Sequence, residues 1–156
     1  MSTTKITGMA VLAAIVLTLF VAAGFADAPT QKPAVPTVAG IQVLFKLDPR
    51  ITRGQYMGDR WVSPPTYTIL GDEQKCVLSA PATGLDPQKK EAPISPTWKP
   101  GDASMVQVSP ARGQQVQITV LKEGQTDLTV AHEKISKKLT VKSVRQNGVL
   151  RVDITQ

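Results

Sequence analysis

KKLTVKSVRQNGVLRVDIT, residues 137–155, holds the clearest structural signal in the chain. Apolar and polar residues alternate on both sides of Asn147-Gly148, which is the period of a strand with one buried face. A type I′ turn needs positive φ at both central positions, and Asn followed by Gly tolerates this best. The stretch therefore predicts a hairpin of two directly paired strands, with Leu139 and Val141 facing a core.

The same alternation recurs in short runs along the chain before this hairpin. The runs are Ile41–Leu47, Lys75–Ala80, Thr97–Lys99, Met105–Val108, Gln115–Leu121 and the segment around Leu128 and Val130. Glycine, proline and aspartate separate them, and Pro81 with the turn-like residues 83–87 is expected to end the second run. The gaps are too short for the crossover helices that parallel strands require. The sequence therefore predicts an all-β fold of about six to eight antiparallel strands, in a sandwich or a barrel.

Composition limits the protein to one ordinary domain. The chain has 156 residues, with 18 Lys and Arg against 12 Asp and Glu, one Cys and one His. A single Cys rules out a disulfide framework, and Cys76 with His132 alone cannot form a Cys/His zinc site. Cys76 is expected to be a small buried residue on a core strand, and the alternative is a disulfide to a partner.

Residues 1–26 have the features of a secretory signal peptide. Lys5 precedes the apolar run Met9–Phe25, and Gly24 and Ala26 form a small-x-small cleavage site. An uncleaved anchor helix is the alternative, since about 17 apolar residues is the short limit for spanning a bilayer. Residues 27–40 are then a Pro-rich linker and residues 41–156 the folded domain. We therefore expect export to the periplasm, the cell surface or the extracellular space.

Residues 94–143 resemble the second half of a bacterial Ig-like group 2 domain. The matching pieces occur in the order of that family: ISPTW (94–98), GDASMVQVSP (101–110), VQITVL (116–121), KEGQTDLTV (122–130) and KKLTVKS (137–143). In this resemblance Trp98 is the core tryptophan. The resemblance implies an Ig-like antiparallel β-sandwich, to which the Asn147-Gly148 hairpin would be an extra C-terminal element. It also implies a non-catalytic module of exported and surface proteins, with a structural or adhesive role.

The chain offers no residue set that predicts catalysis. Nucleophilic catalysis needs a base, and His132 is the only histidine, within a polar AHEK segment. Most carboxylates stand beside Gly or Pro, as turn-forming residues do, rather than as an acid–base pair. A calcium site in these loops is the alternative, although the EF-hand spacing is missing. The sequence thus predicts no catalytic residues, no resident metal and no cofactor.

Aromatic and arginine side chains gather between positions 53 and 67. Trp, Tyr and Arg are the residue types enriched at binding hot spots. The candidate ligand-binding residues are Arg53, Tyr56, Arg60, Trp61 and Tyr67. The glycines and prolines around them predict a loop or an irregular edge. The alternative is that this loop folds back and Trp61 closes one end of the sandwich.

The last 25 residues carry most of the excess positive charge. The candidate basic patch comprises Lys134, Lys137, Lys138, Lys142, Arg145 and Arg151, against only Glu133 and Asp153. Lys138 and Lys142 are expected to share the outward face of a strand. Such a patch would attract an anionic cell-envelope polymer. The alternative is a solvated face whose lysines protect an edge strand from aggregation.

The positive charge of the last 25 residues and the expected export together indicate the kinds of partner to expect. We expect a protein or an anionic cell-envelope polymer as partner, and membrane contact only through an uncleaved signal helix, if at all. Nucleic acid is not expected, because the protein is exported and aromatic residues make up 4% of the chain. A polysaccharide- or peptidoglycan-binding module and a subunit of a surface fibre are the alternatives to an adhesive module.

Overall fold

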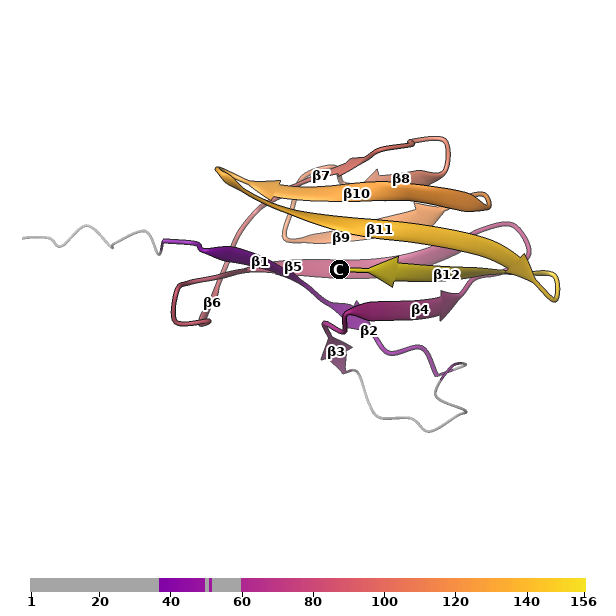
Figure 1. Ribbon diagram of the computed structural model, residues 1–156, viewed down its shortest axis with the longest axis horizontal. Helices are drawn as coiled ribbons and strands as arrows, with labels where there is room; N and C mark the ends of the chain where they lie inside the picture. Colours follow the sequence, from indigo (N-terminus) through magenta and orange to yellow (C-terminus); the bar gives the residue numbers. More distant parts are fainter. Residues whose placement is uncertain (1–36, 50, 52–59) are drawn as a thin grey trace, which may run out of the picture. The chain divides into compact units, whose positions relative to one another are not determined.

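The computed structural model of the protein describes residues 37–49, 51 and 60–156. The expected signal peptide, most of the expected linker, and Arg53 and Tyr56 lie outside these residues. The strands of the described residues form two five-stranded antiparallel sheets and a two-stranded ribbon, in a sandwich-like all-β arrangement (Figure 1). Within the same ranges, no helix has the length and hydropathy of a bilayer span.

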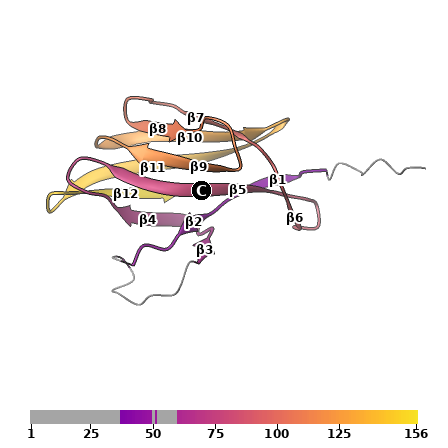
Figure 2. The ribbon, with the colours of Figure 1, turned by 180° about the vertical axis from the view of Figure 1, so that it is seen from behind.

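The first sheet, which we call the β5 sheet, is built around a ten-residue strand. Its strands in spatial order are β1 (Gly40–Val43), β5 (Cys76–Leu85), β9 (Gln115–Val120) and β8 (Val106–Ser109), with β6 (Glu91–Ala92) paired to the end of β5. Figure 2 shows this sheet in front.

The second sheet, the β11 sheet, contains the predicted hairpin. Its strands in spatial order are β4 (Thr66–Leu70), β12 (Val149–Thr155), β11 (Ile135–Gln146), β10 (Gly124–His132) and β7 (Thr97–Pro100). The ribbon consists of β2 (Phe45–Lys46) and β3 (Trp61–Val62).

Alternation of apolar and polar residues buries one face of each sheet. The buried apolar residues of β9 and the centre of β11 are Val116, Ile118, Val120, Leu139 and Val141, as the sequence predicts. Trp98 of β7 is 2% exposed, and its indole N–H donates to the carbonyl of Gly113 at 3.0 Å. Cys76 is likewise buried, at 1% exposure on β5. The prediction of an all-β fold with Trp98 and Cys76 in its core is therefore confirmed.

Asn147 and Gly148 form the tight turn of the predicted hairpin. Their φ angles are 53° and 81°, and Gln146 pairs with Val149 across the turn. The hairpin is not an extra element, however, because β12 lies between β11 and β4 inside the sheet. The inward side chains of β12 are fully buried, namely Leu150, Val152 and Ile154. The expectation of an added C-terminal hairpin is wrong, since these residues supply part of the core.

β5 continues through Pro81 to Leu85, so the expected end of this strand at Pro81 is also wrong. Pro81 lies where β1 ends, and its carbonyl accepts the N–H of Leu44 at 2.9 Å. The N–H that proline lacks therefore costs the sheet only a terminal hydrogen bond. The chain reverses later, at Asp86, whose N–H donates to the carbonyl of Lys90 at 3.0 Å.

Candidate functional site

Arg60 and Trp61 lie at the ribbon that β2 and β3 form beside β4. Trp61 pairs with Lys46, and Figure 1 shows the ribbon next to β4 at one margin of the β11 sheet. Trp61 is 39% exposed and Arg60 is exposed. Trp61 therefore does not close an end of the sandwich, and its indole is available at the surface.

Tyr67 lies in the core, unlike the other two candidates that the structure describes. Only the end of the segment expected to be a loop or irregular edge belongs to a longer strand: the edge strand β4 begins at Thr66, and in it Tyr67 points inward with 4% exposure. Its ring stacks on Phe45 with 4.6 Å between centroids and 13° between planes. Its hydroxyl donates to the carbonyl of Lys46 at 2.5 Å. Tyr67 thus anchors the ribbon that carries Trp61 rather than lining its surface.

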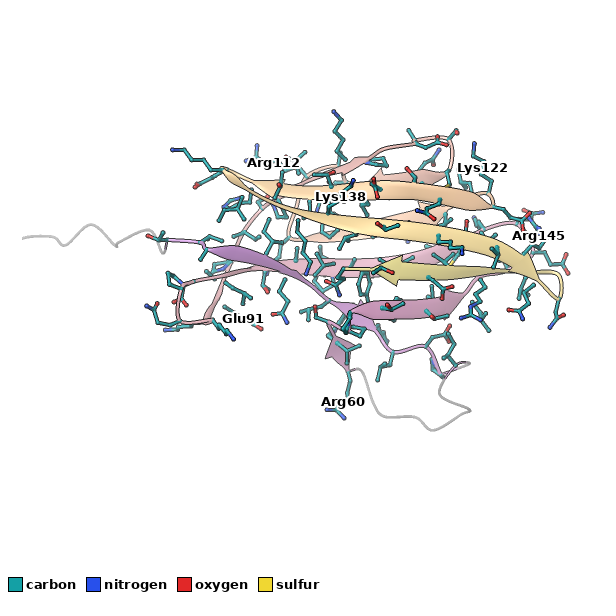
Figure 3. The ribbon with its side chains drawn as sticks, viewed as in Figure 1. Arg60, Glu91, Arg112, Lys122, Lys138 and Arg145 are labelled. Atoms are coloured by element: carbon teal, nitrogen blue, oxygen red, sulfur yellow. The ribbon has the colours of Figure 1, made fainter. Side chains whose placement is uncertain are left out.

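The six residues of the candidate basic patch do not form one surface. They fall at three places along the hairpin: Lys134 and Lys137 near the β10–β11 turn, Lys138, Lys142 and Arg151 on the outer face of the β11 sheet, and Arg145 near the β11–β12 turn. A strand of 12 residues is roughly 36 Å long, so its two ends cannot contact one small ligand together. Figure 3 shows the separation between Lys138 and Arg145, whose guanidinium donates to the carbonyl of Glu73.

Acidic side chains neutralise part of the outer face of the β11 sheet. The ammonium of Lys138 lies 2.7 Å from the carboxylate of Asp127, and the guanidinium of Arg151 lies 3.4 Å from that of Asp153. The hydrogen bond from Lys138 is the main reason that the pKa of Asp127 lies below its ordinary value. The lysines do not protect an edge strand, because β11 lies in the middle of its sheet.

Carboxylates at two turns bind nearby amides, as turn formers do. The carboxylate of Asp72 accepts the N–H of Lys75 at 2.6 Å and that of Gln74 at 2.8 Å, which lowers its pKa. The carboxylate of Asp102 accepts the hydroxyl of Ser104 at 2.5 Å and its N–H at 2.8 Å, and these bonds lower its pKa in the same way. Among the described residues, no three His, Cys, Asp or Glu side chains are placed to hold a metal ion.

His132 lies at the end of β10, beside a surface hollow of about 430 Å³. The hollow lies between the start of the described domain and the β10–β11 turn, and its other lining residues are Thr37, Val38, Pro93, Glu133, Lys134 and Ile135. The lining thus brings the imidazole of His132 to the same hollow as the hydroxyl of Thr37 and the side chains of Glu133 and Lys134.

The outer face of the β5 sheet is a candidate surface that sequence reasoning missed. The strands β1, β5, β8 and β9 contain no Asp, Glu, Lys or Arg. Outward positions carry mostly Gln, Ser and Thr, with Val77 exposed at 41%. The uncharged stretches are visible in the sequence, but they define one surface only when the pairing of the four strands is known.

The described residues thus define an all-β, sandwich-like protein whose candidate sites lie on a ribbon and on the outer faces of its sheets. In comparisons with protein-family models, with curated proteins and with solved structures, none matches this chain. The resemblance to bacterial Ig-like group 2 domains therefore stays a prediction from the residues that carry it.

Proposed function

We propose that this protein is an exported, non-catalytic β-sandwich of the Ig-like type that serves as a structural or adhesive interaction module in the periplasm or at the cell surface. Export follows from the signal-like residues 1–26. The Ig-like assignment is supported by the resemblance of residues 94–143 and is compatible with two packed antiparallel sheets.

The observation that carries the binding role is the exposure of Trp61. A large indole at 39% exposure is held on a ribbon by the pairing of Trp61 with Lys46, and the ribbon is held by Tyr67 and Phe45. Trp is the residue type most enriched at binding hot spots, and Arg60 beside it is another such type. A rigid base under an exposed aromatic side chain lowers the entropy cost of binding.

Replacement of Trp61 by Ala tests this role. We expect affinity for the partner to fall roughly 30-fold or more, because truncating a hot spot costs about 2 kcal/mol or more. The melting temperature should change by no more than about 3 °C, because Trp61 is 39% exposed and does not belong to the hydrophobic core. Val144→Ala is the matched control, since Val144 is 40% exposed on β11, away from the ribbon.

The partner is found by crosslinking in envelope fractions of the native cell, and its adduct is then quantified for each variant. Sedimentation with purified, protein-free cell wall distinguishes a wall polymer from a protein partner. Full adduct formation by Trp61→Ala would contradict the proposal. A collapse of melting in the same variant would show that Trp61 is part of the core.

A further inference from the structure

The two sheets of the sandwich differ sharply in the charge of their outer faces. On the β11 sheet, Lys138, Lys142 and Arg151 alternate with Asp127 and Asp153. On the β5 sheet, the strands β1, β5, β8 and β9 present no ionisable Asp, Glu, Lys or Arg side chain at all. The only charged residue within the strands of this sheet is Glu91, on the short strand β6 at the end of β5. Charged residues make up 19% of the chain, so four paired strands without them are a marked local departure.

The uncharged face is organised in cross-strand rows. One row runs Gln107, Thr119, Val77 and the next runs Ser109, Gln117, Ser79, across β8, β9 and β5. Neighbouring strands lie about 4.8 Å apart and successive rows about 6.8 Å apart. Among the strands that the structure describes, Figure 2 shows none over these three. The result is an array of small or flexible polar groups on an open sheet face.

The chemistry of this array selects an uncharged ligand rich in hydroxyl groups. Each Gln amide and each Ser or Thr hydroxyl both donates and accepts hydrogen bonds, as a sugar hydroxyl does. The exposed side chain of Val77 adds an apolar surface at the end of one row. An anionic polymer gains no Coulomb attraction here. A protein partner with an ordinary charged surface would bury its charged side chains against this face. They would find no opposite charges there, which is unfavourable.

We propose that the outer face of β5, β8 and β9 binds an uncharged polysaccharide. This site is distinct from the Trp61 ribbon, so its failure would leave the proposed interaction module standing. The ligand lies along the sheet face, and amides and hydroxyls of the two rows replace its water. Binding of this kind is independent of ionic strength, because no ion pair contributes to it.

Gln117→Glu is the sharpest test, because it changes one amide into a carboxylate at the centre of a row and nearly conserves the shape. Gln125→Glu is the matched control: Gln125 is also exposed on a strand, but it lies on β10 in the other sheet. Both variants should melt within about 2 °C of the parent protein, as exposed substitutions usually do.

The intact protein is run by affinity electrophoresis through gels that contain dextran, barley β-glucan, glucomannan or starch, and is sedimented with microcrystalline cellulose. Dextran sulfate is the charged counterpart of dextran. We expect retention by at least one uncharged polysaccharide, unchanged between about 0.05 and about 0.5 M NaCl. Gln117→Glu should weaken it at least tenfold, and Gln125→Glu should leave it unchanged.

Three results would overturn the proposal. The first is a lack of retention by every uncharged polysaccharide, including the case in which dextran sulfate alone retards the protein. The second is an equal loss of retention in both variants. The third is a dimer in analytical ultracentrifugation that Gln117→Glu dissociates, without polysaccharide binding, because the face would then be occupied by a second copy of the chain.

Discussion

Replacing Tyr67 by Phe removes a single oxygen atom from the core. The effects of this change on melting and on binding distinguish two roles for Tyr67: support of the ribbon that carries Trp61, or contact with the ligand. The Tyr67 hydroxyl donates to the backbone carbonyl of Lys46 at 2.5 Å, and Lys46 pairs with Trp61. The variant keeps the ring that stacks on Phe45 at 4.6 Å. The change therefore removes the hydrogen bond from Tyr67 to the ribbon and leaves the ring stacking in place.

The expected cost is about 1 kcal/mol, because one intramolecular hydrogen bond contributes roughly 0.5–1.5 kcal/mol net. For a domain of this size that corresponds to a fall in melting temperature of about 4 °C. Tyr67→Ala removes the ring as well, and its cost should rise to about 3–5 kcal/mol, as for other large aromatic truncations in a core.

Thermal melting followed by circular dichroism gives the first measurement, and partner affinity on the same samples gives the second. Tyr67→Phe should reduce affinity only a few-fold, because the stacked ring still supports the ribbon. Normal melting together with lost binding would show that the hydroxyl touches the ligand, as the sequence suggested. Normal melting with normal binding would show that the bond to Lys46 stabilises nothing.

Two further predictions concern stability. Burial lowers the pKa of Lys137 in the folded protein below its ordinary value of 10.5. At pH values below the lowered pKa, the charged ammonium therefore destabilises the folded state. This destabilisation disappears as the pH rises past 10.5, where the amine is neutral in both states. Lys137→Met should therefore raise the melting temperature at neutral pH and lose this advantage toward pH 10.5, whereas a drop at neutral pH would contradict the reasoning. At Gly71, an added Cβ would lie 2.5 Å from the carbonyl oxygen of Lys75, whereas at Gly40 it would meet nothing within 4 Å. Gly71→Ala should cost about 1–3 kcal/mol in urea unfolding and Gly40→Ala close to nothing, and equal costs would refute the clash.

Local turn chemistry and alternation were enough to predict much of the fold. Asn147-Gly148 specifies its turn through backbone sterics alone, and the alternation in β9 and β11 needs only one buried face. The same rules missed β4, because the glycines and the Pro64-Pro65 pair upstream of it predict irregular structure. Pairing with β12 makes Thr66–Leu70 a strand, and this long-range contact is not encoded locally.

The candidate sites show a similar limit. Lys134 and Arg145 are close in sequence but lie at opposite ends of β11, because an extended strand carries its ends far apart. Tyr67 and Trp61 are six residues apart, yet one is buried and the other exposed, since the chain enters β4 between them. Grouping residues by sequence distance therefore predicted residue types that suit binding, but not which of them share a surface.

The partition of charge between the two sheets also determines how the binding surfaces can be told apart. An anionic polymer on the β11 sheet would compete with Asp127 for Lys138 and with Asp153 for Arg151, so these pairs reduce the attraction that the sequence count suggests. Whatever attraction remains is screened over about 8 Å at physiological ionic strength and weakens as salt is added. Contacts on the face of β5, β8 and β9 gain no such Coulomb attraction, because these three strands carry no charged side chain. A ligand whose affinity is constant across a salt series and falls in Gln117→Glu therefore uses the β5 sheet. One whose affinity falls with salt but not in Gln117→Glu uses another surface, either the charged face of the β11 sheet or the ribbon beside Arg60.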